Sequence, residues 1–388
     1  MTPRLMQAAL LLVLAGACGA APSRPAAAAS ERPFSMSEVA RFDRPWAMDF
    51  LPGSGVRLTA MALVTEKGGA LWLVDTGSGA RQPVAGVPAV HVEGQGGLAD
   101  VVAHPGFAGN QRIYLSFPQR RPDGTSGATV GYGRLILGQG QPRIEGFRTI
   151  WNQAPTVDGG GHYAERLAFA PDGTLFISSG ERMQFDPAQD KRTTLGKIVR
   201  ITDEGGIPAD NPFHVPNANS PNANSLVKPD IWSLGHRNPL GLAFAPDGRL
   251  WSTEMGPRGG DELNLIVRAE NYGWPRASYG SHYDGRDIPD DHAGRGFAEP
   301  KVWWNPSISP GGLLIYSGDL FKGWKGDAII PALSGEALIR VDIAGEIARK
   351  ADHWPMGARI RAVDQGPRGE LYLLEDGDGG RLRLEPTP

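Results

Sequence analysis

The sequence contains very little cysteine: Cys18 is the only one among 388 residues. A single thiol forms no intramolecular disulfide and cannot complete a cysteine-ligated metal site, so neither device holds the fold together. An excess of one charge sign is also missing, since 39 Lys and Arg face 42 Asp and Glu and no Lys/Arg-rich run occurs. A nucleic acid partner is therefore not expected.

Several catalytic motifs are absent as well. The sequence has no G-x-G-x-x-G after a strand-like run, no Walker loop, no H-E-x-x-H and no G-x-S-x-G. These absences remove support for nicotinamide enzymes, nucleotide hydrolases, zinc proteases and α/β-hydrolases. Segments with a 3.6-residue apolar period and capping residues are scarce, which favours a mostly β protein.

The first eighteen residues have the layout of an export signal. Arg4 precedes an uncharged apolar run that is too short to span a bilayer, and small residues follow it. Cys18 comes directly after Leu14-Ala15-Gly16-Ala17, which resembles the lipobox of bacterial lipoproteins, although Ala15 stands where leucine is commoner. Two interpretations stay open: a lipid anchor on Cys18 at the outer membrane, or an ordinary cleaved signal. Both predict an exported, periplasmic protein whose residues 19–33 form a flexible tether.

Glycine and proline are abundant, with 53 and 33 residues, and they mark a pattern that recurs after residue 34. Each copy has an apolar run, a proline, turn residues with glycine, and a second apolar run. The hexapeptide AFAPDG occurs twice, at 168–173 and 243–248. Together with four looser copies, the anchoring prolines are Pro52, Pro105, Pro171, Pro246, Pro310 and Pro367.

The P-D-G sequence is typical of a β-turn, because proline presets the backbone, Asp fits the next position and Gly closes the turn. Apolar runs on both sides make each copy a β-hairpin. Six units in about 355 residues leave about 59 residues per unit, enough for a four-stranded blade with its loops. Residues 34–388 are therefore predicted to form one domain, an all-β, six-bladed β-propeller; two tandem β-sandwiches would not explain the sixfold recurrence. The polar stretches 203–229 and 276–299 are expected to be insertions, either on the binding face or simply solvated.

Residues at the same offset from the anchoring proline should lie at the same end of their blades. Eight to ten residues before four of these prolines the sequence has Gln95, His162, Arg237 with Asn238, and Arg359, which Arg361 follows two residues later. After the fourth turn the chain returns to this rim with Met255-Gly256-Pro257, and Asp261 and Glu262 follow.

Such a rim suits a small, planar, polyanionic ligand, because arginine binds carboxylates bidentately. Main-chain carbonyls of a Gly-Pro loop suit a hard cation such as Ca²⁺. Each residue also has a structural alternative, since a lone histidine near a strand end is more often a hydrogen-bonding partner than a base. Rim arginines are commonly exposed ion pairs of little energy. The shared offset is the feature that favours a site.

These residues resemble the soluble PQQ-dependent sugar dehydrogenases, particularly the aldose sugar dehydrogenases of the glucose/sorbosone dehydrogenase family. The likeness runs from about residue 40 to 385. Its strongest parts are GQGGLADVVAHPGF (94–107), H-x-x-x-R (162–166) with LAFAPDG, LGHRNPLGLAFAPDG (234–248), GPRGGDELNLI (256–266), NYGWP (271–275) and RIR (359–361). The family fold is a six-bladed propeller, which agrees with the repeat count.

The resemblance implies an enzyme that oxidises the C1 hydroxyl of aldose sugars to the lactone, with hydride transfer to PQQ and electrons passed to an unidentified external acceptor. It implies His162 as the general base and Arg237 as the positive charge beside the reactive quinone carbonyl. It also implies four cofactor contacts, Gln95, Asn238, Arg359 and Arg361.

The same resemblance implies two Ca²⁺ sites. Gly256 and Pro257 match the loop whose carbonyls hold the Ca²⁺ that bridges to PQQ. Glu262 and Tyr272 match a second, structural site, with the tyrosine contributing its main-chain oxygen.

The sequence departs from the family at three positions. Ser334 stands where some members have a cofactor-binding lysine, Arg182 where another has a glutamine, and Gly161 where an acid can precede the base. A non-catalytic propeller that binds a glycan or protein stays open as an alternative because of Ser334. A calcium-dependent lactonase is the other alternative, although it would need metal-ligating carboxylates where this rim has arginines.

Overall fold

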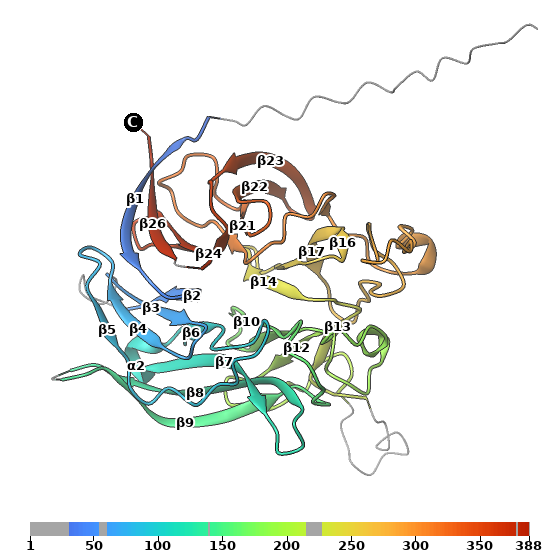
Figure 1. Ribbon diagram of the computed structural model, residues 1–388, viewed down its shortest axis with the longest axis horizontal. Coiled ribbons are helices and arrows are strands. Elements are labelled where there is room, and N and C mark those ends of the chain that lie inside the picture. Colours follow the sequence, from blue (N-terminus) through green and yellow to red (C-terminus); the bar gives the residue numbers. More distant parts are fainter. Residues whose placement is uncertain (1–30, 54–59, 139, 215–226, 378, 388) are drawn as a thin grey trace, which may run out of the picture.

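The computed structural model describes residues 31–53, 60–138, 140–214, 227–377 and 379–387. Its strands form six four-stranded antiparallel sheets, which follow one another around the molecule (Figure 1). The predicted six-bladed β-propeller is therefore confirmed. The export signal and Cys18 lie outside the described residues. None of the helices in the described segments has the length and apolar character needed to cross a bilayer.

The first three blades follow the chain in order, each beginning with its innermost strand. Blade 1 consists of β2 (Pro45–Phe50), β3 (Met61–Glu66), β4 (Leu71–Asp75) and β5 (Arg81–Pro83). Blade 2 consists of β6 (Val101–Ala103), β7 (Arg112–Arg120), β8 (Ser126–Ile136) and β9 (Arg143–Asn152). Blade 3 consists of β10 (Ala164–Phe169), β11 (Leu175–Ser179), β12 (Lys197–Ile201) and β13 (Ile231–Leu234).

The other three blades complete the ring. Blade 4 consists of β14 (Pro239–Phe244), β15 (Leu250–Glu254), β17 (Asp261–Ile266) and β19 (Val302–Trp304). Blade 5 consists of β20 (Leu314–Ile315), β21 (Ala328–Ala332), β22 (Ala337–Ala344) and β23 (Ile347–Pro355). Blade 6 consists of β24 (Ile360–Gln365), β25 (Leu371–Glu375), β26 (Gly380–Pro386) and β1 (Phe34–Arg41). The short elements are the strand pair β16 (Arg258–Gly259) and β18 (Gly280–Ser281), helix α2 (Phe107–Asn110), and two 3₁₀ helices, Asp186–Gln189 and Ala293–Arg295.

The ring is closed by pairing between the two ends of the chain. β1 lies beside β26 (Figure 1), with Phe34 opposite Pro386 and Arg41 opposite Gly380. Phe34 is buried, and its ring meets Trp354 edge-on at 5.4 Å between centroids. The pairing covers a strand edge that would otherwise be open, so the fold is closed without any covalent link.

The two P-D-G segments form the predicted hairpin turns. Gly173, at φ 83°, closes the turn between β10 and β11, and Gly248, at φ 85°, closes the turn between β14 and β15. Left-handed backbone of this kind carries little strain in glycine, which explains its place after Pro-Asp.

One anchoring proline is placed wrongly by the sequence pattern. Pro310 precedes β20 and bridges to Ala332, whereas the turn of this hairpin lies at 316–327. The apolar run after Pro310 is thus the first strand of the blade, not the second. The pattern failed here because the proline is part of the blade's inner edge.

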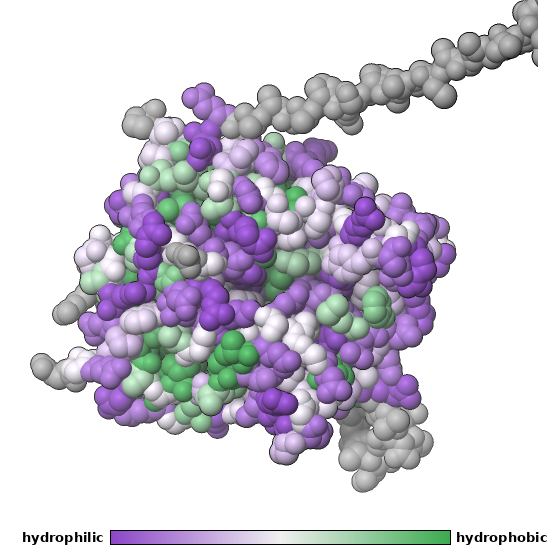
Figure 2. All heavy atoms as spheres, viewed as in Figure 1, coloured by the Kyte–Doolittle hydropathy of each residue, from purple (hydrophilic) through white to green (hydrophobic). Residues whose placement is uncertain are grey.

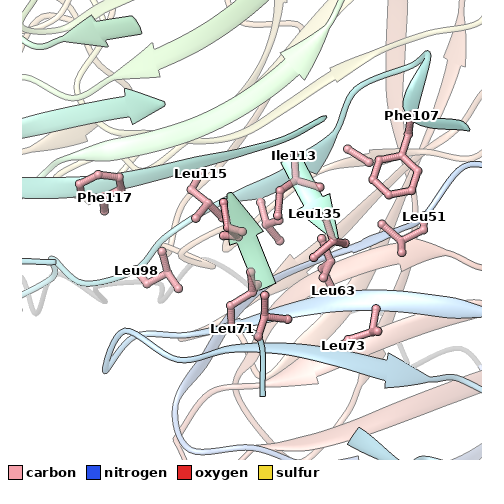
Figure 3. Packing of buried hydrophobic residues seen from close by; sticks show 14 residues of the cluster. Leu51, Leu63, Leu71, Leu73, Leu98, Phe107, Ile113, Leu115, Phe117 and Leu135 are labelled. Atoms are coloured by element: carbon pink, nitrogen blue, oxygen red, sulfur yellow. The ribbon is translucent and has the colours of Figure 1, made fainter. Parts of the chain in front are cut away.

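Apolar side chains from neighbouring blades form the core. Leu63 and Leu71 of blade 1 lie in one buried cluster with Ile113 and Leu115 of blade 2 (Figure 3). Each such side chain stabilises the fold by roughly 1.5–3 kcal/mol when it leaves water. The surface in Figure 2 is mainly polar, with an apolar area over β7 and β8.

The centre of the ring is held by one buried side chain. Arg166 on β10 is 8% exposed and donates to the carbonyls of Leu240 in blade 4 (2.7 Å) and Gly311, just before blade 5 (2.6 Å). It pairs with Asp100, just before blade 2, at 3.2 Å, and its guanidinium lies 3.9 Å from the centre of the Trp46 ring in blade 1. Arg166 therefore connects five of the six blades.

We expect Arg166→Met to lower the free energy of unfolding by about 3–5 kcal/mol, because it leaves the buried Asp100 carboxylate without its cation. Urea unfolding measures this loss. Adding Asp100→Asn should restore part of the stability, since the uncompensated charge is removed with its partner. Arg249→Met is the matched control, because the one salt bridge of Arg249 in the described part of the chain is with the exposed Asp247 of a turn. Equal losses in both single variants would contradict the central role of Arg166.

Candidate active site

Two adjacent cavities lie at one end of the propeller. The larger cavity, of about 430 Å³, is lined by four of the predicted residues, Gln95, Asn238, Arg359 and Arg361. The smaller cavity, of about 230 Å³, is lined by three others, His162, Arg237 and Pro257. The cavities adjoin because the next residues in the chain, Tyr163 and Asn238, lie in the wall of the larger one. The structure therefore brings residues from four blades to one rim.

His162 is held in one orientation by a carboxylate. Its Nδ1 lies 2.5 Å from Oε1 of Glu181, and its backbone N–H donates to Oε1 of Gln95 at 2.8 Å. Because Nδ1 donates to the carboxylate, a neutral imidazole has its free lone pair on Nε2. Burial lowers the pKa of His162, although the hydrogen bond to Glu181 opposes that shift. The arrangement therefore favours a neutral histidine that can accept a proton.

Arg237 and Asn238 lie between the two cavities with polar atoms unsatisfied. The Nη1 of Arg237 donates to the carbonyl of Gly256 at 2.7 Å, and its Nη2 donates to Oη of Tyr283 at 3.2 Å. Its backbone N–H donates to the carboxylate of Glu254. Buried Nε of Arg237 and Oδ1 of Asn238 have no hydrogen-bond partner in the described part of the chain. Such orphaned atoms cost about 1–3 kcal/mol each, which is consistent with a ligand between them.

The larger cavity carries an excess of positive charge. Arg359 and Arg361 both pair with Asp376, each at 3.0 Å. Burial raises the pKa of Asp376, but the charges of Arg361 and Arg359 outweigh it and hold that pKa below its ordinary value. Two further cations, Arg44 and Lys67, line the same cavity. One ionised aspartate in the wall cannot balance four cations, so the cavity fits a polyanionic ligand.

A third, very small cavity lies beside the predicted Ca²⁺ ligands. It is lined by Gly256, Glu254, Glu262 and Tyr272, while Pro257 faces the smaller cavity instead. Burial and the neighbouring Glu254 raise the pKa of Glu262 well above its ordinary value, as expected of a carboxyl that lacks a nearby cation. The Tyr272 hydroxyl donates to the carbonyl of Leu265 at 2.5 Å.

These features fit the donor set of a structural cation site, but not a preformed cage. In the described residues, no three His, Cys, Asp or Glu side chains gather in a way that could hold a metal. The Tyr272 side chain is engaged elsewhere, so only its main-chain oxygen could be a ligand. At the other site, the carbonyl of Gly256 already accepts from Arg237, so a cation bound there would share this oxygen with the guanidinium or displace it.

Ser334 and Arg182, where the sequence departs from the family, lie outside both cavity walls. The Ser334 hydroxyl is exposed and donates to Oγ of Ser309, which does line the larger cavity, at 2.8 Å. Arg182 is buried and donates to the carbonyls of Gly161 (2.8 Å) and Ser126 (2.6 Å). Arg182 thus supports the loop that carries His162 rather than contacting a ligand.

The backbone around His162 is strained. His162, Ala164 and Glu165 have φ angles of 47°, 64° and 72°, in the left-handed region that favours glycine. Glu165 lines the larger cavity and is 2% exposed, and its buried Oε1 has no hydrogen-bond partner among the described residues. Burial raises the pKa of Glu165 well above its ordinary value. Strain and an unpaired carboxyl are therefore concentrated at this rim.

Sequence reasoning missed five residues of the site: Arg44, Lys67, Glu165, Glu181 and Asp376. It searched the segments before each anchoring proline, whereas Glu181 and Asp376 follow the second strand of their hairpins. Gly180-Glu181 have the same offset from Pro171 as Met255-Gly256, which the sequence reasoning did examine, have from Pro246, and Asp376 has the same offset from Pro367 as Met255 has from Pro246. The same offset rule, applied after every hairpin, would have found both.

The chain is similar to known proteins along most of its length. The family model for glucose / sorbosone dehydrogenase matches residues 42–384. The chain is 40% identical over 353 residues to the aldose sugar dehydrogenase YliI of Escherichia coli (strain K12), a match that covers 90% of this chain and 91% of that protein.

Solved structures give the same result. The soluble aldose sugar dehydrogenase from Escherichia coli, in its apo form, matches with a TM-score of 0.84 and 38% identity over 91% of this chain and 100% of that one. The PQQ-bound aldose sugar dehydrogenase from Streptomyces coelicolor matches with a TM-score of 0.73 and 25% identity over 91% of this chain and 98% of that one.

We expect Glu165→Gln to raise the free energy of unfolding of the cofactor-free protein by about 1–2 kcal/mol at pH 7.5. With its raised pKa, Glu165 keeps its proton in the folded protein, while the unfolded chain loses it above about pH 4.3. The free energy of unfolding of the wild-type protein therefore falls as the pH rises from the unfolded-state pKa of Glu165 to its folded-state pKa. The amide of the Glu165→Gln variant does not titrate, so it makes no such contribution. Urea unfolding of both proteins at pH 4.5 and 7.5 should give curves that converge at the lower pH. Glu346→Gln, at an exposed position, is the control and should leave the free energy of unfolding unchanged. If Glu165→Gln raised the free energy of unfolding equally at both pH values, the interpretation would be wrong.

Proposed function

Since the chain belongs to the glucose/sorbosone dehydrogenase family of oxidoreductases, we propose that it oxidises the C1 hydroxyl of aldose sugars to the lactone with PQQ and Ca²⁺. The observation that carries the proposal is the pair of His162 and Glu181 at the junction of a cationic cavity and a smaller, more apolar one. The larger cavity would hold the cofactor and the smaller one the sugar.

His162 takes the hydroxyl proton in this proposal. Its Nε2 accepts the proton of the C1 hydroxyl while the hydrogen on C1 leaves with its electron pair, so the sugar loses one proton and one hydride. Bound PQQ would supply the two-electron acceptor. Glu181 keeps Nδ1 protonated and stabilises the imidazolium that results. Arg237 lies beside His162 in the same cavity wall and offers positive charge where negative charge would develop.

The cofactor's carboxylates would be bound by the cations of the larger cavity. Arg359 and Arg361 offer guanidinium forks that are held in place by Asp376. Lys67 and Arg44 add charge from blade 1, which offsets the missing lysine at position 334. The oxygen of the Gln95 amide is taken by the His162 backbone, so its NH₂ group is the part left for the cofactor.

Ca²⁺ would be held by the carbonyls of Gly256 and Pro257, and a second ion by Glu262 with the main-chain oxygen of Tyr272. A bound Ca²⁺ would act as a Lewis acid at the cofactor. The proposal also includes export to the periplasm by residues 1–18, with or without a lipid on Cys18, and transfer of electrons to an external acceptor.

We expect His162→Gln to abolish dye reduction with glucose while PQQ still binds the apoprotein with wild-type affinity. The amide keeps polar contacts but cannot accept the proton. Wild-type kcat/KM should stay high down to a pH below the ordinary histidine pKa of about 6.5, because burial lowers the pKa of His162.

Two results would contradict the assignment of the base: dye reduction at the wild-type rate by the His162→Gln variant, or an acid limb of the profile above pH 6.5. Absence of dye reduction by wild-type protein at every PQQ and Ca²⁺ concentration would refute the proposed function itself.

We expect Lys67→Met to weaken PQQ binding about tenfold and Ser334→Lys to strengthen it by a similar factor, since a charge-assisted hydrogen bond contributes about 1.5–3 kcal/mol. Titration of the apoprotein with PQQ, followed by absorbance, measures both. Both differences should shrink at 1 M salt. Lys325→Met, in an exposed pair with Asp319, is the control and should leave the affinity unchanged. Unchanged affinity in Lys67→Met would remove this residue from the cofactor site.

A further inference from the structure

The loop after β11 carries two exposed apolar side chains beside His162. Met183 is 52% exposed and Phe185 is 42% exposed, and both line the smaller cavity. Three residues of this loop, Arg182, Met183 and Phe185, have φ angles of 59°, 60° and 64°. Left-handed backbone in such residues costs about 1–3 kcal/mol each and persists where the surroundings impose it. Apolar side chains that gather in the wall of one cavity, as these two do, are typical of a ligand-binding groove.

The surroundings impose this loop conformation through the same groups that hold His162. Oε2 of Glu181 accepts the backbone N–H of Phe185 at 2.6 Å, while its Oε1 holds the imidazole. The sulfur of Met183 lies close over Gly161, 2.7 Å from where a Cβ on that glycine would be, so the Met183 side chain sits directly beside the residue before the base. The position of the Phe185 backbone is therefore fixed relative to His162.

Phe185 is part of an aromatic wall, defined here as Met183, Phe185, Trp274 and Tyr283. The rings of Phe185 and Trp274 are stacked at 5.7 Å between centroids and 28° between planes. Tyr283, 69% exposed, accepts from Arg237, so the far side of the wall is tied to the other charged group of the site. The segment 276–299, expected from its sequence to be an insertion, thus contributes to the binding face.

The shape and chemistry of the smaller cavity suit one sugar ring. Its volume of about 230 Å³ is below the roughly 300–1,000 Å³ of typical ligand pockets. A pyranose with equatorial hydroxyls presents C–H bonds on both faces and hydroxyls at its edge. Aromatic rings bury the C–H face, and exposed polar groups that line the cavity, such as Asp284 and Arg286, can meet the edge.

Resting on the proposed function, we propose that the aromatic wall is the sugar-stacking subsite, and that Phe185 and Tyr283 determine which aldopyranoses place their C1 hydroxyl against His162. Sugars whose ring faces are apolar bind by stacking on Phe185 and Tyr283. Acidic sugars lose this advantage, because a carboxylate near the wall would be desolvated. The aromatic wall therefore selects sugars by the apolar character of the ring face rather than by the position of individual hydroxyl groups.

Phe185→Ala tests this inference, with methyl glucoside as the probe. The methyl group on the C1 oxygen of this sugar prevents oxidation, so it reports binding alone. We expect the KM for glucose and the inhibition constant of methyl glucoside to rise about fivefold, with kcat within twofold, since the Phe185 backbone N–H to Glu181 is kept. Phe185→Trp should restore both values. Met36→Ala, which removes an exposed apolar side chain on β1, is the control and should change neither value.

Sugar binding to the apoprotein, measured by quenching of tryptophan fluorescence, is the readout independent of turnover. If wild-type protein reduces no dye but Phe185→Ala still weakens methyl glucoside binding, the proposed function fails and the subsite stands. If dye reduction occurs and Phe185→Ala changes neither KM nor the inhibition constant, the subsite is refuted. A fall in kcat alone would also refute it, because the loop would then act through Glu181 on the base.

Discussion

The guanidinium of Arg166 is the contact on which the rest of the molecule depends. A propeller without disulfides is held together only where its blades meet, and the large apolar clusters each join neighbouring blades. Arg166 crosses the centre and contacts residues of four other blades or of the segments that lead into them. It is four residues after His162, so the same short segment fixes the axis of the ring and places the proposed base. A change in the packing of the blades would therefore move the imidazole.

The Glu181 carboxylate has a comparable role at the rim. One oxygen sets the tautomer of His162 and the other holds the backbone of Phe185, so a single side chain relates the proposed proton acceptor to the surface on which the sugar would lie. Proton transfer requires the hydroxyl within hydrogen-bond reach of Nε2, and small displacements of bound substrate reduce rates steeply. A ligand that stacks on Phe185 is thereby placed relative to the imidazole by one rigid group rather than by two independent loops.

The fold was largely predictable because its repeating unit is local. A P-D-G turn between apolar runs needs only neighbouring residues, and hairpins form at Pro171 and Pro246 as predicted. Pro310 failed because a proline at the inner edge of a blade has the same local sequence as one in a turn. In the site, His162 and Arg237 were found by their offset, whereas Lys67 and Glu165 were not. Their presence in the cavity depends on how the blades are arranged around the ring, and no spacing within one repeat encodes that.

Several groups that destabilise the isolated chain gather around the candidate site. The left-handed backbone at His162, Ala164 and Glu165 and the orphaned atoms of Arg237 and Asn238 all lie in the walls of the two cavities or beside them. The P-D-G turns, by contrast, are satisfied: Asp172 and Asp247 each accept a backbone N–H two residues on. Strain and unmet hydrogen bonds at a fixed place are retained when a ligand relieves them or when function requires them. A cofactor whose carboxylates and ring atoms met these groups would therefore stabilise the rim most, and its binding free energy would act on the loop of His162, the very segment that also carries Arg166.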